Sequence, residues 1–461
     1  MNKFRKRKGK FKFLSFAMAC LLAVGSIAYA APGGASSTAF DQKVVKRIDA
    51  QRALEHIQYL SEQIGPRVAG TIEELRAAEY IKDQFAKLGY QVEMQEFEIK
   101  NVVPHLYLDS GGNQEIRANA ATGSGYTDPQ GITATIVDCG LGQELAAFPQ
   151  KVKGNIALIQ RGMVTFAEKV KNAVEAGAVG VIIYNNVDGL ITPTLTPYES
   201  PIPVVCISSK DGETVKQGGM VGTIMAELKT QSQNIVAKRL PNKSNGKTGI
   251  VHVTAHYDSV PLAPGANDNA SGTAAMLELA RVLKAYPIDK EIRFIACGAE
   301  EIGLKGSEYY VSQLNDEEIT RSIGNFNMDM IATSYDKCNI LYADTVDGEA
   351  NLISDTAIAS GARLGKDLLA VNYGRSSDHA PFGDFGIPAA CFIWGDDKGK
   401  LEPWYHTPED NLAINFSLAK LETACDVIGA AIYEVLRKPT PNLDRNPLDN
   451  QLVTRQFGKL E

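Results

Sequence analysis

The chain has 461 residues, of which 44% are hydrophobic and 22% are charged, and its formal net charge at pH 7 is −7. This length and composition are typical of a globular protein with a large core and about two domains, and they exclude a fibrous or wholly disordered chain. An acidic chain is also a poor partner for nucleic acid, so we expect no nucleic-acid binding.

Residues 1–30 have the parts of a secretory signal peptide. Seven of the first 12 residues are Lys or Arg, an apolar run extends from 13 to 28, and Ala28-Tyr29-Ala30 supplies small residues for cleavage after Ala30. The run is short for a bilayer span of about 20 residues, which disfavours a single-pass anchor. A lipoprotein is a further alternative, but Cys20 lies in the middle of the run. We therefore predict a secreted, extracellular protein without membrane contact after cleavage.

Cleavage after residue 30 would make the mature chain more acidic. It removes seven of the 47 basic residues and none of the 54 acidic residues, so the formal net charge becomes −14. Six widely spaced cysteines remain without a CxxC pair, which argues against a zinc knuckle or a dense disulfide framework. Three of them lie in apolar, strand-like runs where a buried thiol is expected, namely Cys206, Cys297 and Cys391.

The first half of the mature chain changes texture near residue 100. Residues 41–88 carry apolar side chains at helical spacing, and a strand-like run at 90–99 follows Gly89. From 102 to 229 the pattern is one of short strands with frequent Gly and Pro and one helix, at 132–137, 156–159, 165–176 (the helix), 179–184 and 203–207. This pattern predicts a compact, mostly β domain inserted into a larger domain.

After residue 232, apolar strands alternate with helical stretches, and the last helix covers about 418–436. The strands are predicted at 251–255, 292–297, 323–328 and 389–394. Such alternation predicts the α/β class, with a mostly parallel mixed sheet flanked by helices. Ligands of such sheets bind at the carboxyl ends of the strands.

Acidic residues and histidines stand just beyond three of these strands, namely His256, the doublet Glu300-Glu301, and Asp329. Because parallel strands end at the same edge of a sheet, we expect these side chains to converge. Asp268 lies in the turn-rich stretch 265–272 before a predicted helix, and His406 follows in the pair Tyr405-His406. Each residue alone is commonly a cap or turn former, but together they predict a metal site.

Imidazole nitrogen and carboxylate oxygen are ligands that zinc accepts, and paired catalytic ions lie about 3.5 to 4 Å apart. We predict two Zn²⁺ ions per chain, bridged by Asp268. His256 and Asp329 would complete one site, and Glu301 and His406 the other. Three carboxylates leave the two ions one net positive charge, which favours a bound hydroxide as the nucleophile.

Two further acidic residues remain after the ligands are assigned. Asp258 stands two residues after His256, so on a strand it can face the same way and accept the second imidazole N–H; a strand-end cap is the alternative. Glu300 is the predicted general base, which takes a proton from water and delivers it to the leaving amine. Burial would raise the pKa of Glu300, and the neighbouring cations would lower it.

These residues resemble the zinc exopeptidases of the M28 family. The family pattern is H-x-D, N-D-N-x-S-G, E-E-x-G, a strand ending in D-M, and a final histidine. This chain has His256-Tyr257-Asp258, Asn267-Asp268-Asn269-Ala270-Ser271-Gly272, Glu300-Glu301-Ile302-Gly303, Asn327-Met328-Asp329-Met330 and Tyr405-His406-Thr407. The resemblance extends over about 232–436 and implies the zinc exopeptidase fold.

The resemblance also implies roles that spacing alone does not give. In the family, the tyrosine before the last histidine donates a hydrogen bond to the developing oxyanion, so Tyr405 takes that role, with an aromatic packing residue as the alternative. A cis peptide between Asp268 and Asn269 is likewise implied. The segment 373–382 resembles the loop that borders the substrate pocket. There Arg375 is expected to contact the peptide, with a solvated loop residue as the alternative, and Asp378 is expected to order the loop.

The inserted domain resembles a protease-associated (PA) domain in the stretches 153–162 and 176–186. M28 members with this insertion resemble the vacuolar aminopeptidase Y type, and we expect the domain to cover the zinc cleft and restrict which peptides enter. The predicted organisation is a signal peptide at 1–30, a zinc peptidase domain at 41–100 and 232–440, the inserted PA domain at 101–231, and a C-terminal tail at 441–461.

The function that the resemblance implies is a secreted di-zinc aminopeptidase acting on peptides. Leu or another large apolar residue is the expected N-terminal residue of the substrate, with Arg or Lys as the alternative. A carboxypeptidase or dipeptidase is the alternative within the family, because the metals do not decide which end of a peptide enters. A glutaminyl cyclase shares the fold but usually binds one metal. A non-catalytic, receptor-like homologue would have lost ligands or the base, which are all present here. The sequence predicts no particular oligomeric state.

Overall fold

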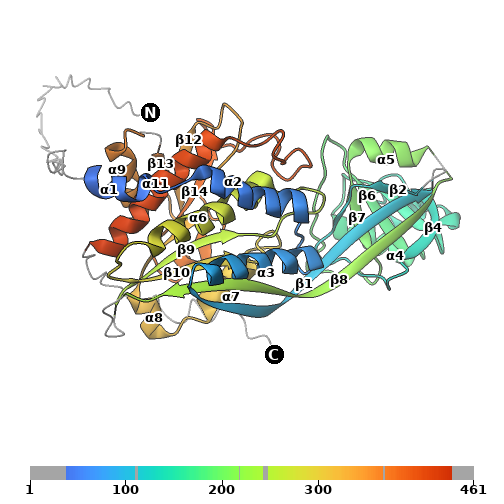
Figure 1. The fold of residues 1–461 in the computed structure, drawn as a ribbon. Helices are drawn as coiled ribbons and strands as arrows, with labels where there is room; N and C mark the ends of the chain where they lie inside the picture. The colour runs from blue at the N-terminus through green and yellow to red at the C-terminus, as the bar shows by residue number, and fades with distance from the viewer. Residues whose placement is uncertain (1–37, 110–112, 218, 242–247, 367–368, 439–461) are drawn as a thin grey trace, which may run out of the picture.

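The structure, a computed structural model, describes residues 38–109, 113–217, 219–241, 248–366 and 369–438. The predicted signal peptide and C-terminal tail lie outside these residues. Figure 1 shows a larger, helix-flanked domain beside a smaller inserted domain, joined by the long strands β1 (Gln91–Asp109) and β8 (Val221–Arg239). Fourteen strands form one sheet that passes through both domains, in the order β13-β12-β14-β11-β9-β10-β8-β4-β5-β6-β7-β3, with β1 and β2 off this path.

The larger domain is built on a mostly parallel sheet, as predicted. Its strands are β9 (Ile250–His256), β10 (Glu291–Cys297), β11 (Ser322–Met328), β12 (Ile340–Thr345), β13 (Leu369–Tyr373) and β14 (Ala389–Gly395). β9 pairs in parallel with β10 and β11, and β11 pairs in parallel with β14. The exceptions are β12, antiparallel to β14, and β8, antiparallel to β10. The carboxyl ends of β9, β10 and β11 therefore lie at one edge.

Helices cover both faces of this sheet. One face packs against α1 (Thr38–Val45), α2 (Ala50–Gln58), α3 (Ile72–Lys87), α6 (Gly272–Lys284), α9 (Leu352–Arg363) and α11 (Leu418–Arg437). The other packs against α7 (Lys305–Ser312), α8 (Asp316–Arg321) and α10 (His379–Asp384). Alternate residues of one strand point to opposite faces; on β10, Phe294 joins the first core and Ile295 the second.

The sequence sets several helix starts through capping side chains. Asp49 before α2 accepts a hydrogen bond from the Gln51 N–H, Thr71 before α3 from Glu74, and Ser417 before α11 from Lys420. Each cap satisfies a backbone donor that the helix itself leaves unpaired. The predicted helical region 41–88 is thus three segments, with the π-helical turn η1 (Tyr59–Ile64) continuing α2.

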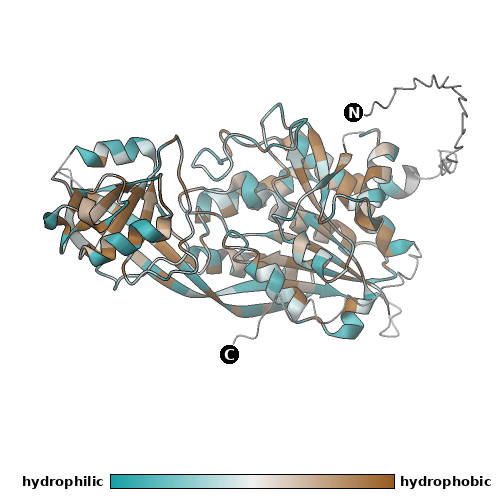
Figure 2. Cartoon of the chain, turned by 180° about the vertical axis from the view of Figure 1, so that it is seen from behind, coloured by the Kyte–Doolittle hydropathy of each residue, from teal (hydrophilic) through white to brown (hydrophobic). Residues whose placement is uncertain are grey.

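The inserted domain contains the other end of this sheet and two small cores. It contains β2 (Asn113–Ile116), β3 (Asn119–Ala120), β4 (Ile132–Asp138), β5 (Ile156–Gln160), β6 (Gly180–Tyr184), β7 (Val204–Ile207), α4 (Phe166–Glu175) and α5 (Ser209–Lys216). On β5, Leu158 faces one core and Ile159 the other. Figure 2 shows the apolar strands of both domains between more hydrophilic outer helices.

The strand predicted to end at residue 99 continues to Asp109, so the chain enters the inserted domain without leaving the sheet. β1 and β8 form a long antiparallel ribbon, in which Glu98 pairs with Gln231 and Asn101 with Lys229. Two residues of β1 therefore face one of β8, which is a β-bulge. On either side of the bulge, the residues of β1 alternate between more buried and more exposed positions. The sequence pattern of this strand therefore does not mark the domain boundary.

Two smaller expectations concern cysteines and the membrane. Cys206, Cys297 and Cys391 are buried, as predicted, and the six cysteines within the described ranges are all free thiols. In the part of the chain that the structure describes, no helix is both long and apolar enough to span a membrane.

Candidate metal centre

The edge formed by β9, β10 and β11 gathers the predicted ligands. His256 is the last residue of β9, Asp329 directly follows β11, and the doublet Glu300-Glu301 lies on the turn after β10. His256, Glu300 and Asp329 are all buried. The convergence of polar side chains at the carboxyl ends of parallel strands is confirmed by the geometry.

Asp268 reaches the same place from η4 (Ala266–Ser271), the turn that leads into α6. Its peptide bond with Asn269 is cis, as the resemblance implied. The Asn269 side chain fastens this turn to the end of β11: Nδ2 donates to the Met328 carbonyl, and Oδ1 accepts from the N–H groups of Gly272 and Met330. A Cβ on Gly272 would lie 2.2 Å from the Met328 carbonyl oxygen, so a glycine is required there.

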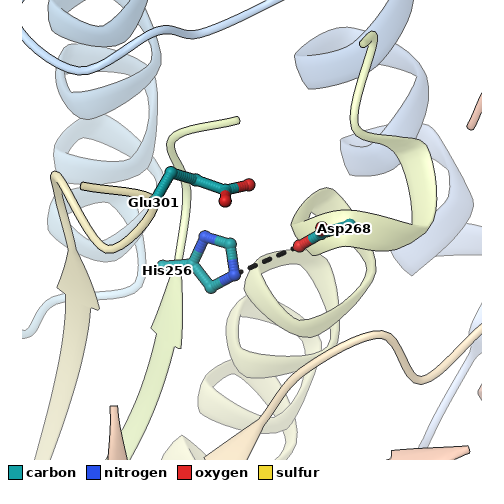
Figure 3. Close-up of side chains that lie close together, drawn as sticks. All are labelled: His256, Asp268 and Glu301. Carbon is teal, nitrogen blue, oxygen red and sulfur yellow. Dashed lines mark ion pairs between the residues drawn. The ribbon is translucent and has the colours of Figure 1, made fainter. Parts of the chain in front are cut away.

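Asp268 presents one carboxylate oxygen to each of two histidines. Its Oδ1 lies 3.3 Å from His256 Nε2, the contact drawn in Figure 3, and its Oδ2 lies 3.2 Å from His406 Nε2. His256 Nε2 is also 3.4 Å from Asp329 Oδ1. His406 Nε2 is 3.0 Å from Glu301 Oε2. The five side chains thus form two groups that share Asp268.

The donor set fits zinc, because it combines imidazole nitrogens with carboxylate oxygens. Two of its atoms, Asp329 Oδ1 and Glu301 Oε1, are buried and have no hydrogen-bond partner among the described residues. A buried carboxylate oxygen without a partner is costly unless a cation satisfies it. The unused acceptors therefore face a space suited to a metal ion.

Two triplets bring their ligand atoms within 4.8 Å of one another, His256–Asp268–Glu301 and His256–Glu300–Asp329. These triplets divide the residues differently from the prediction, because His256 belongs to both and His406 to neither. The contacts of His406 Nε2 with Asp268 and Glu301 favour the predicted division. Glu300 lies in the same space beside His256 and Asp329.

Asp258 does more than the sequence indicated. Its carboxylate accepts the N–H of Glu300 at 3.1 Å and that of Glu301 at 3.2 Å, so it fixes the backbone of the doublet. The same carboxylate lies 3.6 Å from His256 Nδ1, and the Asp258 carbonyl oxygen lies closer, at 3.2 Å. Asp258 therefore links one histidine to the two glutamates of the neighbouring strand.

Burial and neighbouring carboxylates control protonation at the site. Burial raises the pKa of Glu300 well above its usual value, and Glu301 and Asp378 add to the rise while His256 opposes it. Bound divalent cations would lower it again. Burial beside the carboxylates of Asp268 and Glu301 also raises the pKa of Tyr405, so the phenol keeps its proton at neutral pH. The Tyr405 ring stacks on His406, with centroids 3.7 Å apart, and is 41% exposed.

The two residues predicted on the 373–382 segment lie in different environments. Arg375 is exposed, and its Nη2 pairs with Asp384 Oδ1 at 2.5 Å, so its contact with substrate stays a prediction. Asp378 is fully buried, and burial raises its pKa to about 6, with His256 and Asp258 among its charged neighbours. Its role in ordering the loop stays a prediction.

Three further residues, which the sequence pattern did not predict, support the candidate ligands through hydrogen bonds. Ser377 Oγ donates to Asp329 Oδ2 at 2.7 Å, which leaves Oδ1 for a metal. Asp410 accepts the N–H groups of Asn267 and Asp268 at 2.9 and 3.0 Å. Arg67, fully buried, donates to the carbonyls of Tyr257, Pro264 and Gly265 and holds the loop before Asp268. Of the three, only Ser377 could have been suspected from the sequence, because it directly precedes Asp378.

A cleft of about 690 Å³ opens onto the site between the two domains. Its floor includes Glu301, Tyr405 and His406, and an apolar side is formed by Val260, Pro261 and Ile302. Residues of the inserted domain form the opposite wall, among them Arg117, Asn119, Thr122 and Ser124. A peptide that reached the metal centre would pass between the domains.

Comparisons with known sequences agree with this arrangement. The profile described as Peptidase family M28 matches residues 234–432, and the PA domain profile matches residues 132–215. Aminopeptidase YwaD of Bacillus subtilis (strain 168) is 46% identical over 393 residues, which cover 84% of this chain and 85% of that protein. A probable leucine aminopeptidase 2 of Aspergillus oryzae is 28% identical over 82% of this chain and 83% of its own length.

Solved structures show the same likeness. BSAP, a zinc aminopeptidase from Bacillus subtilis, aligns with a TM-score of 0.74 and 45% identity, over 86% of this chain and 96% of that structure. An aminopeptidase from Aneurinibacillus sp. strain AM-1 aligns with a TM-score of 0.62 and 38% identity, over 89% and 98% of the two chains.

Proposed function

This chain belongs to peptidase family M28 and is a zinc metallo-aminopeptidase, and from that premise we propose a secreted enzyme that holds two zinc ions and removes N-terminal residues from peptides. The observation that carries the proposal is the position of Asp268, with one oxygen 3.3 Å from His256 Nε2 and the other 3.2 Å from His406 Nε2. A carboxylate shared by two histidine groups suits a pair of catalytic ions.

In this proposal His256 and Asp329 would hold one ion, Glu301 and His406 would hold the other, and Asp268 would offer one carboxylate oxygen to each. The unpaired oxygens of Asp329 and Glu301 support the assignment, one for each ion. Ser377 and Asp258 keep these ligands in place through their hydrogen bonds. When bound, the two ions would polarise the scissile carbonyl group and lower the pKa of a water molecule.

The chain's own residues carry the proton transfers. Glu300 takes a proton from the attacking water at its carboxylate and delivers it to the amide nitrogen as the C–N bond breaks. Its burial favours the protonated state that forms after the first transfer. Tyr405 keeps its phenol proton and donates a hydrogen bond to the carbonyl oxygen as negative charge develops there.

The direction of cleavage rests on the relatives. Aminopeptidase YwaD and BSAP both carry the name of an aminopeptidase and align over most of this chain. No comparable observation favours the carboxypeptidase or dipeptidase alternative. We therefore propose that the free amino group of the peptide enters the cleft toward the metal centre.

Large apolar residues are the proposed N-terminal residues of the substrate. Val260, Pro261 and Ile302 give the cleft an apolar side next to Glu301 and His406. The cleft lining also contains Glu199, whose carboxylate could pair with the positive charge of an N-terminal Arg or Lys of a substrate. This carboxylate is already paired with Lys100.

Secretion and the domain boundaries belong to the same proposal. The predicted signal peptide at 1–30, which lies outside the described residues, supports export. The PA domain match at 132–215 lies within the proposed inserted domain, 101–231. The M28 match at 234–432 lies within the proposed peptidase domain. Arg375 and Asp378 stay proposed as a substrate contact and a loop-ordering residue.

The test combines metal analysis of the mature protein with a substrate panel. We expect about two zinc ions per chain and hydrolysis of aminoacyl-nitroanilides, fastest for Leu and other large apolar residues. Peptides with a blocked N-terminus serve as the control and should stay intact. One ion per chain would contradict the di-zinc proposal, and cleavage of the blocked peptides would contradict the aminopeptidase proposal.

A further inference from the structure

One residue of the inserted domain contacts the metal centre's own backbone. Arg117, just after β2, donates from Nη2 to the carbonyl oxygen of His406 at 2.5 Å. The two residues are 289 positions apart in the sequence. Arg117 is half-buried, and it forms part of the cleft wall opposite the apolar residues. The contact therefore joins the inserted domain to a predicted zinc ligand.

The backbone of His406 explains why such a contact matters. His406 has a φ of +58°, in the left-handed region that residues other than glycine seldom adopt. A conformation of this kind persists only when surrounding contacts hold it. Within the loop, the Thr407 N–H bonds to the Trp404 carbonyl, which closes a turn around Tyr405 and His406. Arg117 supplies a hydrogen bond to this turn from outside the loop.

The guanidinium of Arg117 carries a positive charge beside this loop. Glu409 in the loop and Asp211 on α5 both favour the charged guanidinium, whereas burial lowers its pKa. Arginine remains protonated in proteins, so the group keeps its positive charge.

The position of the contact complements the covalent connection between the domains. The β1–β8 ribbon joins them at one side of the cleft, with a bulge near the domain boundary where Lys100 pairs with Glu199. A bulge bends and twists a ribbon locally. The Arg117–His406 bond adds an attachment of the inserted domain at the metal centre.

We propose that Arg117 is a positioning residue through which the inserted domain holds the Tyr405–His406 turn in place. The hydrogen bond keeps the His406 imidazole within reach of Asp268 and Glu301, and it keeps the Tyr405 ring stacked on that imidazole. This role rests on the proposed di-zinc function. It makes the inserted domain part of the support for one metal site as well as a wall of the cleft.

The test compares Arg117→Met with Arg161→Met, a matched variant of the same domain whose arginine bonds to Asn185 inside that domain. In chelator competition, we expect Arg117→Met to lose one of its two zinc ions at a chelator concentration about 10- to 100-fold lower, as for other residues that support metal ligands. The other ion should stay as firmly bound as in the wild type. We also expect kcat to fall more than KM changes, and excess zinc to restore part of kcat.

A second readout does not depend on metal or activity. Hydrogen exchange in residues 402–411 of the metal-free chain should be faster in Arg117→Met than in Arg161→Met. Equal exchange in the two variants, or retention of both ions with wild-type affinity, would overturn the role of Arg117. A wild-type chain that binds fewer than two ions would instead overturn the proposed function, and the exchange comparison would still decide about Arg117.

Arg117→Lys keeps a charged hydrogen-bond donor at this position. It provides a second test in case Arg117→Met does not fold. We expect it to hold the second ion more firmly than Arg117→Met does. If Arg117→Met does not fold, Arg117→Lys is compared with Arg161→Lys for zinc release and exchange. A second ion held as firmly in Arg117→Lys as in Arg161→Lys, with equal exchange in residues 402–411, would then overturn the proposal.

Discussion

The larger domain and the inserted domain are built alike but differ in the polar groups beyond their strands. Both have parallel strands with apolar cores on two faces. After β5 and β6 of the inserted domain, the polar side chains satisfy one another: Arg161 donates to Asn185 Oδ1, and Asn185 donates to the Gly189 carbonyl. After β10 and β11 of the larger domain, one buried oxygen each of Glu301 and Asp329 lacks a hydrogen-bond partner among the described residues.

This difference teaches that unused acceptor capacity, and not the fold, marks the metal centre. A buried carboxylate oxygen without a partner destabilises the protein unless a cation occupies the space. Among the described residues at the ends of β5 and β6, the buried atom without a hydrogen-bond partner is the Tyr184 hydroxyl and not a carboxylate oxygen, so the same architecture serves there as a scaffold. Function lies in the site and not in the layers that carry it.

The largest effect is expected from Glu300→Gln. The substitution keeps the size of the side chain and removes its ability to take a proton from water, so kcat should fall by about 10²- to 10⁴-fold. Both zinc ions should stay bound, because Glu300 is not among the proposed ligands. Steady-state kinetics and metal analysis on the same preparation measure the two quantities.

The control for this variant is Glu308→Gln, at a half-buried residue paired with Lys305 on α7. It should retain wild-type kcat. Wild-type turnover in Glu300→Gln would remove Glu300 from the proton transfers, and loss of an ion would make it a ligand instead of a base.

The next effect is that of metal removal, which should separate the two domains. A ligand present at 1,000 times its dissociation constant stabilises the folded state by about 4 kcal/mol, and chelation removes this contribution. We expect faster hydrogen exchange at the ends of β9, β10 and β11 after chelation and little change in β5 and β6. Equal loss of protection in both domains would contradict the comparison.

The sequence predicted the fold through its apolar strands. The runs at 251–255, 292–297 and 323–328 are buried on both faces, and such runs leave little choice but a parallel sheet. The β1–β8 ribbon was not predicted beyond residue 99, because a half-exposed ribbon has no continuous apolar run and its pairing joins residues far apart in the chain. The boundary of the inserted domain is therefore less marked in the structure than in the sequence.

The ligands were predictable because zinc chemistry restricts their types and a parallel sheet restricts their positions. Their supports were not. Ser377, Asp410 and Arg67 act through hydrogen bonds to an oxygen or to backbone groups. Many residue types form such bonds, and they depend on tertiary contacts that the sequence does not spell out. Arg375 shows the converse, because its motif position suggested substrate while its side chain pairs with Asp384.

Ser377→Ala should have a smaller effect than metal removal. It deletes the hydrogen bond to Asp329 Oδ2 and frees the carboxylate to rotate, so zinc affinity should fall by about 10- to 100-fold. Ser376→Ala, the neighbouring serine, is the control and should bind zinc as the wild type does. Unchanged affinity in Ser377→Ala would mean that the metals alone orient Asp329.

The smallest effect is expected from His56 in the larger domain. Its Nδ1 lies 2.6 Å from the Tyr80 hydroxyl. His56 therefore has a nearby partner, as Arg161 and Asn185 of the inserted domain do. Burial, with Arg52 adding to it, lowers the pKa of His56 to about 4. The unfolded chain takes up a proton below pH 6.5 and the folded chain does not until about pH 4, so the free energy of unfolding decreases between these values.

His56→Gln removes this proton uptake, so its stability should fall less with acid than that of the wild type. The difference should be on the order of 1 kcal/mol, because the ring is partly exposed and solvent weakens the effect. Denaturant unfolding of both metal-free proteins at pH 7 and pH 4.5 measures it, since chelator removes the separate effect of zinc release in acid. Parallel losses would show that His56 is protonated in the folded chain as well. The contact with Tyr80 would then not keep His56 neutral in the folded chain.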